Sequence, residues 1–182
     1  NSYIKLGNQR YTHHTYCSCS IAQYFFEYRL SDSCTYTSGI DLQAKNMLTA
    51  YKQSKSELAI SYLDTLLQLE PTSNAYWAIK GMCEARLGKF EEALRSVNSA
   101  MENATSAAEK RNTLYAYANY YALSGDKENA IKYLKESIDL GFSNYTHIIN
   151  DADLRNIKDY PPFIELTNEL KNKKEPADKK KR

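Results

Sequence analysis

The residues best suited to bind a metal gather near the start of the chain. His13 and His14 are followed by Cys17 and Cys19, and Cys34 comes further on. Thiolates and imidazoles are the ligands that zinc and copper prefer. However, Cys-x-Cys is not a usual spacing for a structural zinc site, and no second paired cluster follows. We therefore predict no metal site and no cofactor, while a disulfide from Cys17 or Cys19 to Cys34 stays open for an oxidising compartment.

Groups that could catalyse a reaction are few in the rest of the chain. The only other histidine is His147, and there is no glycine-rich phosphate loop, nucleophile elbow or paired-histidine motif. The acidic pairs Glu91/Glu92 and Asp151/Asp153 have the pattern of solvated faces and helix starts rather than of an acid and a base. We therefore predict no catalytic residues and a chain that is not an enzyme.

Composition restricts the elements that could position any site. The chain of 182 residues is 42% hydrophobic, enough to bury one sizeable core, and its six Gly and four Pro are few for a fold full of tight turns. The sequence therefore predicts one all-α domain.

The net charge of +2 is unevenly distributed. Residues 171–182 carry a charge of +5, so the rest of the chain carries −3. An acidic body does not favour nucleic acid, and a short basic end would be strongly screened by salt. We expect no nucleic-acid partner.

The stretch from Asn74 to Ala100 has the pattern of two amphipathic helices joined at Gly88. The large ring of Trp77 lies one helical turn before Gly81, and small residues flank Val97 on the second helix, so the two helices can approach closely. This pattern predicts an antiparallel helical hairpin with Trp77 largely buried.

This hairpin resembles a tetratricopeptide repeat (TPR). The matching residues are Trp77, Gly81, Ala93 and the turn Gly88-Lys89-Phe90, whereas Lys80, Glu84 and Val97 stand where Leu, Tyr and Phe are usual. The pattern recurs 34 residues earlier at Ala59, Leu63 and Pro71, and 37 residues later at Gly125, Ala130 and Leu134. The resemblance implies a right-handed α-solenoid of about three hairpins plus a closing helix pair.

The element boundaries follow from caps and periodicity. Helices are expected near 40–52, 55–69, 74–87, 90–103, 107–124, 127–140, 151–158 and 161–172. Capping boxes are predicted at Ser54/Glu57 and Ser106/Glu109, and Gly141 is predicted to cap a helix in the left-handed conformation.

The end of the helical region has a pattern of its own. It resembles the short terminal unit of many bacterial TPR arrays, through Asp153, Leu154, Ile157, Lys158, Pro161, Phe163 and Leu166. This resemblance implies a bacterial source. We expect Leu154 and Ile157 to cover the apolar face of the preceding helix.

Three segments are expected: an atypical N-terminal segment over 1–38, a TPR domain over 39–172 and a basic disordered tail over 173–182. In the first segment, Ile21, Tyr24, Phe25 and Tyr28 follow the spacing of one helical face, which suits a helix that caps the first hairpin; the alternative is partial disorder. We find no intact signal peptide and no membrane-spanning stretch. A cytoplasmic location is favoured, with an exported bacterial protein as the alternative.

The function that the resemblance implies is protein binding, because the first helix of each hairpin lines a concave surface. By repeat alignment, this surface would bind a peptide or partner helix through Tyr51, Met82, Asn112, Tyr115 and Asn119. The carboxylate clamp of the family's chaperone-tail binders is absent, since Ala44, Leu48, Ile79, Asn112 and Ala116 stand at its positions. The alternative is a structural or oligomerising module whose groove is filled by its own N-terminal segment.

Overall fold

The computed structural model describes residues 3–6, 9–12 and 39–179, with side chains described over 39–172. Its helices are α2 (Gly39–Lys52), α3 (Ser56–Leu69), α4 (Asn74–Arg86), α5 (Phe90–Glu102), α6 (Ala107–Ser124), α7 (Lys127–Asp139), α8 (Tyr145–Asn150) and α9 (Pro161–Lys179), with a 3₁₀ turn η1 at Arg155–Ile157. The six helices predicted between residues 40 and 140 are confirmed, and their ends differ from the prediction by one residue or none.

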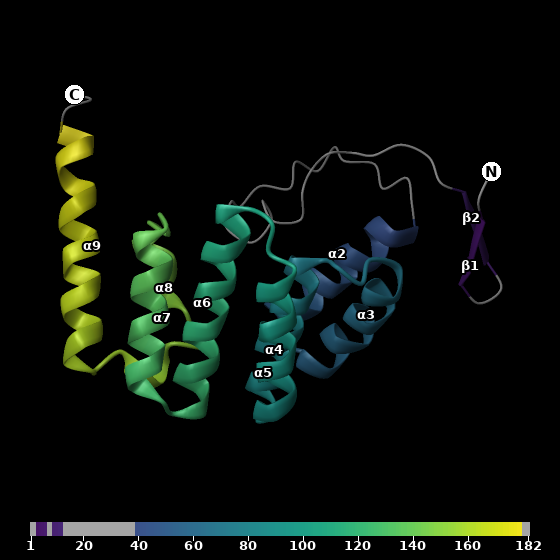
Figure 1. Ribbon diagram of the computed structural model, residues 1–182, viewed down its shortest axis with the longest axis horizontal. Helices are drawn as coiled ribbons and strands as arrows, with labels where there is room; N and C mark the ends of the chain where they lie inside the picture. Colours follow the sequence, from purple (N-terminus) through teal and green to yellow (C-terminus); the bar gives the residue numbers. More distant parts are fainter. Residues whose placement is uncertain (1–2, 7–8, 13–38, 180–182) are drawn as a thin grey trace.

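The helices pack in sequence order as antiparallel pairs. Helix α2 packs on α3, α4 on α5 and α6 on α7, and α4 and α6 join neighbouring pairs. Figure 1 shows these pairs side by side along the long axis, from α2 and α3 (blue) to α9 (yellow). The arrangement is the all-α solenoid that the sequence predicts, with a separate hydrophobic cluster at each junction.

A two-stranded antiparallel hairpin precedes the helices and was not predicted. Strand β1 (Tyr3–Leu6) pairs with β2 (Gln9–Thr12), with Tyr3 opposite Thr12. The predicted capping helix at 21–28, the candidate metal cluster from His13 to Cys34 and the proposed N-terminal filling of the groove lie largely or wholly outside the described residues.

The helices of the central hairpin approach closely at Gly81. A Cβ placed on this glycine would lie 2.5 Å from Val97 Cγ2 and 3.0 Å from the backbone oxygen of Ala93. Both Ala93 and Val97 are fully buried. The small residue at position 81 is therefore required by the crossing of α4 and α5, and Val97 fills the space that the glycine leaves.

We expect Gly81→Ala to destabilise the protein by about 1 to 3 kcal/mol, although alanine favours a helix, because overpacking forces α4 and α5 apart. Urea unfolding measures this cost. The double variant Gly81→Ala/Val97→Ala should lose less stability than the sum of the two single variants, because Val97→Ala removes the methyl group that clashes. If the two substitutions instead add independently, the close approach is not the cause.

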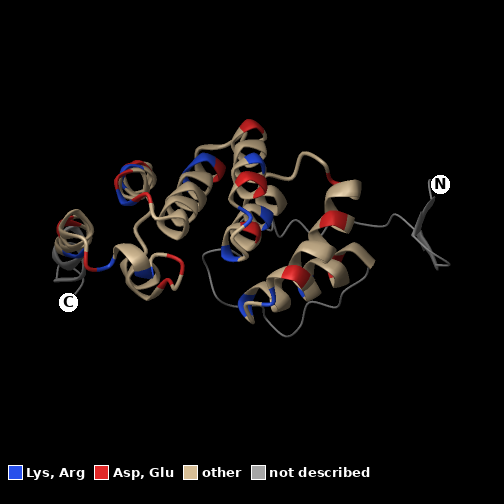
Figure 2. Ribbon diagram, turned by 90° about the horizontal axis from the view of Figure 1, so that it is seen from below, with Lys and Arg blue, Asp and Glu red and all other residues tan. Residues whose placement is uncertain are grey.

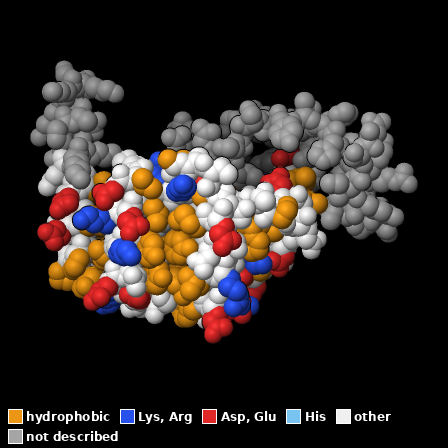
Figure 3. Space-filling view, in the orientation of Figure 1, with side chains coloured by type: hydrophobic (Ala, Val, Ile, Leu, Met, Phe, Trp, Pro, Cys, Tyr) orange, Lys and Arg blue, Asp and Glu red, His pale blue; other side chains and the backbone are white. Residues whose placement is uncertain are grey.

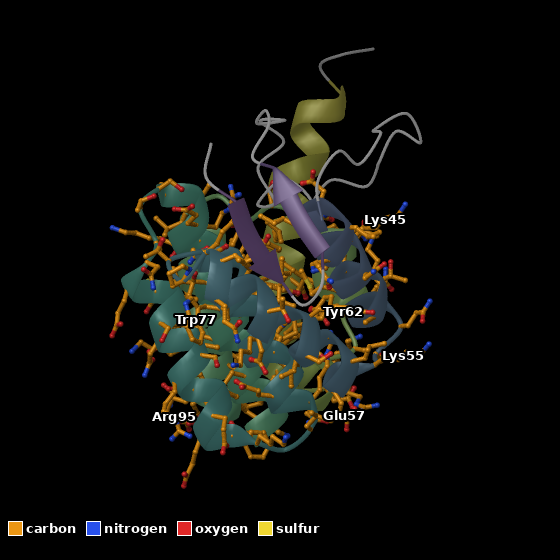
Figure 4. All side chains as sticks on the ribbon, turned by 90° about the vertical axis from the view of Figure 1, so that its right-hand side faces the viewer. Lys45, Lys55, Glu57, Tyr62, Trp77 and Arg95 are labelled. Atoms are coloured by element: carbon orange, nitrogen blue, oxygen red, sulfur yellow. The ribbon has the colours of Figure 1, made fainter. Side chains whose placement is uncertain are left out.

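Trp77 is not the core residue that the sequence predicted. Its side chain is half-buried and donates from Nε1 to the backbone oxygen of Pro71 at 2.8 Å. Figure 4 shows Trp77 on the same side of the array as the exposed Arg95 of α5. The neighbouring Tyr76 is instead fully buried. The prediction of a largely buried Trp77 is therefore wrong by one position along the helix.

Left-handed residues follow α2, α4, α6 and α7. Gly141 has φ of 96° and follows α7, where Phe142 N donates to Ser137 O and Gly141 N to Ile138 O, so the predicted glycine cap is confirmed. Ser54 holds the same place after α2, with φ of 56° and a bond from Lys55 N to Ala50 O. The capping box predicted at Ser54/Glu57 is wrong, because Ser54 ends one helix instead of starting the next.

The second predicted capping box is confirmed at the start of α6. Ser106 Oγ accepts from the backbone N–H of Glu109 at 3.1 Å, and Glu109 Oε2 accepts from the N–H of Ser106 at 2.9 Å. Two backbone donors at the helix start are satisfied in this way.

The region after α7 differs most from the prediction. The expected helix at 151–158 is absent; the chain forms the short helix α8 earlier and then the 3₁₀ turn η1. Leu154 and Ile157 are fully buried against the α6 and α7 core, as predicted. Helix α9 begins at Pro161 as predicted but continues to Lys179, into the segment that was expected to be a disordered tail from residue 173.

Glu84 lies buried between α4 and α5, at a position where the repeat pattern that this hairpin resembles usually has tyrosine. Ser96 Oγ donates to its carboxylate at 2.6 Å, and only 6% of the residue is exposed. Burial raises the pKa of Glu84 above its ordinary value, and the Ser96 hydrogen bond and the charge of Lys80 oppose this rise only in part.

The folded state holds the Glu84 proton more tightly than the unfolded chain does. The free energy of unfolding therefore falls as the pH rises from the ordinary pKa of glutamate to the raised pKa of Glu84 in the folded protein. We expect Glu84→Gln, which keeps an acceptor for Ser96, to raise the melting temperature at pH 7 and to flatten its pH dependence above about pH 4. Thermal melts from pH 4 to pH 7 check this. The exposed control Glu92→Gln should leave the profile unchanged.

Candidate functional site

The candidate site lies on the first helices of the three hairpins, α2, α4 and α6. Tyr51 Oη of α2 donates to Met82 Sδ of α4 at 3.5 Å, and Asn119 Nδ2 of α6 approaches the same sulfur at 3.7 Å. Three of the five predicted binding residues therefore meet in one row across three helices. Met82 is the centre of this row.

The other two predicted residues lie at different depths. Tyr115 is buried one turn before Asn119 on α6, whereas Asn112 is half-buried and accepts a hydrogen bond from Arg111 Nε at 3.3 Å. The structure thus brings Tyr51, Met82, Tyr115 and Asn119 into one region. Asn112 lies apart from them, toward the start of α6.

Residues 142–157, here called the closing segment, lie across this region. Phe142 stacks on the ring of Tyr115 at 4.4 Å between centroids and 12° between planes, and the His147 ring lies 5.4 Å from Tyr115. The same segment packs its 3₁₀ turn on α6. As a result Tyr115 is only 3% exposed and Asn119 only 1%.

Asp151 fixes the closing segment to α6. Its Oδ2 accepts a hydrogen bond from Tyr115 Oη at 2.7 Å and another from Asn119 Nδ2 at 3.2 Å. Its Oδ1 accepts the backbone N–H of Asp153 at 2.9 Å, which sets the spacing of the two carboxylates. His147 Nε2 lies 3.8 Å from Oδ2.

Asp153 fixes the segment to α4 through a bidentate ion pair with Arg86. Arg86 Nε donates to Oδ1 at 2.9 Å, and Nη2 donates to Oδ2 at 2.7 Å. Arg86 also donates from Nη2 to Tyr51 Oη at 3.1 Å, and its guanidinium lies 4.3 Å from the centre of the Tyr51 ring. The pair therefore joins α2, α4 and the closing segment.

The prediction that Asp151 and Asp153 are solvated is wrong. Asp153 is 5% exposed, and both carboxylates point at donors of the repeat helices. Sequence reasoning also missed Arg86. One signal was present, since Arg86 follows Met82 by four residues and therefore shares its helix face.

The tyrosine hydroxyls of the site are protonated and can donate hydrogen bonds. Burial, followed by the charge of Asp151, raises the pKa of Tyr115 well above its ordinary value, and burial does the same to Tyr51. Both hydroxyls therefore stay protonated and act as donors at neutral pH. Burial also raises the pKa of the Asp153 carboxyl, and the hydrogen bonds and charge of Arg86 oppose that rise.

The described residues carry little that could react. Burial raises the pKa of the free Cys83 thiol to about 12, which makes it a poor nucleophile. Within the part of the chain that the structure describes, no group of three His, Cys, Asp or Glu could hold a metal ion. The arrangement where α4, α6 and the closing segment meet is one of hydrogen-bond donors around carboxylates.

A second surface feature lies on the opposite side of the array. Tyr133 of α7 stacks on Tyr117 and Tyr121 of α6, with centroids 4.9 and 5.3 Å away, and Tyr120 contacts Phe90 of α5 edge to face. Figure 3 shows a band of hydrophobic side chains over α6 and its borders with α5 and α7. Of the stacked residues, Tyr121 and Tyr133 are partly exposed, and Phe90 is 36% exposed.

The sequence was compared with models of known protein families and with curated proteins. The family model described as tetratricopeptide repeat matches residues 71–140, which cover α4 to α7. Residues 71–140 are therefore similar to tetratricopeptide repeats, and the stacked helical pairs support a protein of this class. No curated protein matches the chain. No described helix is both long enough and apolar enough to span a membrane.

We expect Asp153→Ala to destabilise the protein by about 2 to 3 kcal/mol, because it leaves Arg86 without its ion-pair partner. The cost stays at the low end since 20% of the Arg86 side chain is exposed and water reaches the guanidinium. Urea unfolding gives the difference. Asp159→Ala is the matched control, an exposed aspartate a few residues further on, and should change stability by less than about 0.5 kcal/mol. Equal effects of the two variants would contradict a structural role for the pair.

Proposed function

We propose that this chain is a non-enzymatic interaction scaffold that binds a peptide or a partner helix on its concave surface, and that it does not act on nucleic acid. TPR proteins serve as protein-interaction modules, which supports the general assignment. The observation that carries the finer proposal is the row formed by Tyr51, Met82 and Asn119. It runs across three consecutive repeats, so one extended ligand can contact all of them.

The closing segment limits where such a ligand binds. It covers Tyr115 and Asn119 in the middle and second half of α6. Half-buried positions remain toward the starts of the first helices, at Ala75 of α4 and Asn112 of α6, together with Leu48 in α2. Binding therefore begins at these positions, and full contact with the row requires the closing segment to move.

Charge on the repeat helices favours a protein partner over nucleic acid. Lysine and arginine are mixed with acidic residues along the described helices (Figure 2). A nucleic-acid surface would instead cluster lysine and arginine on one side.

The test uses peptides selected from a random display library on the full chain, followed by measurement of Kd by fluorescence anisotropy. Ala75→Glu and Asn112→Ala should weaken binding at least tenfold, because the first fills the surface and the second removes a polar contact. Lys132→Ala, an exposed residue of α7 on the other side, is the control and should bind like the parent. If no selected peptide responds to either variant, binding does not occur on the concave surface.

A second candidate function is a structural module whose groove is closed by its own chain. The contacts of the closing segment with α4 and α6 favour it. It predicts that selection on the concave surface yields no peptide. It also predicts that the chain forms a defined oligomer in analytical ultracentrifugation.

A further inference from the structure

The concave surface carries a set of donors that receives two carboxylates. Arg86, Tyr115 and Asn119, here called the donor set, come from α4 and α6, and all three bond to Asp151 or Asp153 of the closing segment. The bonds of Arg86 and Tyr115 are 2.7 Å long, as in charge-assisted hydrogen bonds, and the bond of Asn119, at 3.2 Å, has an ordinary length. The repeats therefore provide the receptor half of this contact, and a later part of the chain provides the ligand half.

The ligand half has a simple sequence. It is an Asp-x-Asp-Leu segment in which the two carboxylates are held at fixed spacing by the bond from the Asp153 N–H to Asp151 Oδ1. The following Leu154 is fully buried in the α6 and α7 core. Leu154 thus adds an apolar contact to the contacts of the two carboxylates.

The charges of the two halves are complementary. The donor set brings the positive charge of Arg86 and two neutral donors, and Tyr51 orients Arg86 by accepting from Nη2 at 3.1 Å. Tyr115 and Asn119 both donate in these contacts, so the atoms that face the closing segment suit an acceptor such as a carboxylate. A neutral or basic segment would leave Arg86 without a counter-charge, which is costly at a largely buried site.

We propose that the donor set is a receptor for an acidic Asp-x-Asp segment of a partner protein, and that the closing segment occupies this receptor in the resting chain. The proposal rests on the function proposed above and names the class of its ligand. The covalently linked segment competes at an effective concentration set by its short connection to α7. Free protein is therefore mostly closed, and only a partner with high local concentration or additional contacts displaces the segment.

The experiment measures binding of a fluorescein-labelled peptide with the sequence of residues 149–158, Ile-Asn-Asp-Ala-Asp-Leu-Arg-Asn-Ile-Lys. The control peptide replaces both aspartates with asparagine. The full chain is compared with Asp151→Asn/Asp153→Asn, which weakens the internal contact. The acidic peptide should bind the double variant at least tenfold more tightly than it binds the parent, and high salt should weaken this binding. The asparagine peptide should not bind either protein.

Two further variants identify the receptor. Adding Arg86→Gln to the double variant should abolish binding of the acidic peptide, whereas adding Arg95→Gln, an exposed arginine of α5, should not. Circular dichroism and melting confirm that each variant is folded. Equal binding of both peptides, or equal binding by parent and folded double variant, would overturn the proposal.

A measurement on the parent protein covers the case in which the double variant does not fold. Excess acidic peptide should speed hydrogen exchange in residues 145–157, and the asparagine peptide should not. Absence of this difference overturns the proposal. Display-selected peptides that lack acidic residues but respond to Asn112→Ala would support the general function and contradict this ligand class, so the two failures are distinguishable.

Discussion

The whole array depends on close packing between the two helices of each hairpin. Alanine occupies the same place in all three second helices, at Ala59, Ala93 and Ala130, and each of these residues is fully buried. A larger residue follows one turn later, at Leu63, Val97 and Leu134, and these are also fully buried. A small residue next to a large one lets two helices interlock, and each hairpin must then bury its remaining apolar surface against the next.

Much of this packing could be predicted because it is local and repeats. The recurrence of Ala59, Ala93 and Ala130 fixes the hairpins, and the Ser106/Glu109 box fixes a helix start from four consecutive residues. Ser54 shows the limit of such local rules. Its sequence context is that of an N-cap, but Lys55 continues the turn that ends α2, so the backbone holds Ser54 in the left-handed conformation.

The candidate site was predicted only in part, because its contacts join residues far apart in the chain. Repeat alignment places Tyr51, Met82 and Asn119 on one surface, and they do meet. Nothing in the local sequence shows that Asp153 turns back toward α4. Its carboxylate has the pattern of a helix start, and the bidentate contact with Arg86 replaces the helix that was expected there. The role of the predicted residues in partner binding stays a prediction.

The pair of Arg86 and Asp153 also bears on how the array unfolds. Most contacts in a solenoid join neighbouring units, so such a chain can lose its end units one at a time. Here the two partners are 67 residues apart and join the middle hairpin to the end of the array. Loss of the last unit must break this pair and expose a charge on α4. The link therefore makes the unfolding of α4 to α9 more cooperative. During synthesis, the contact between Arg86 and Asp153 can form only after residue 153 has left the ribosome.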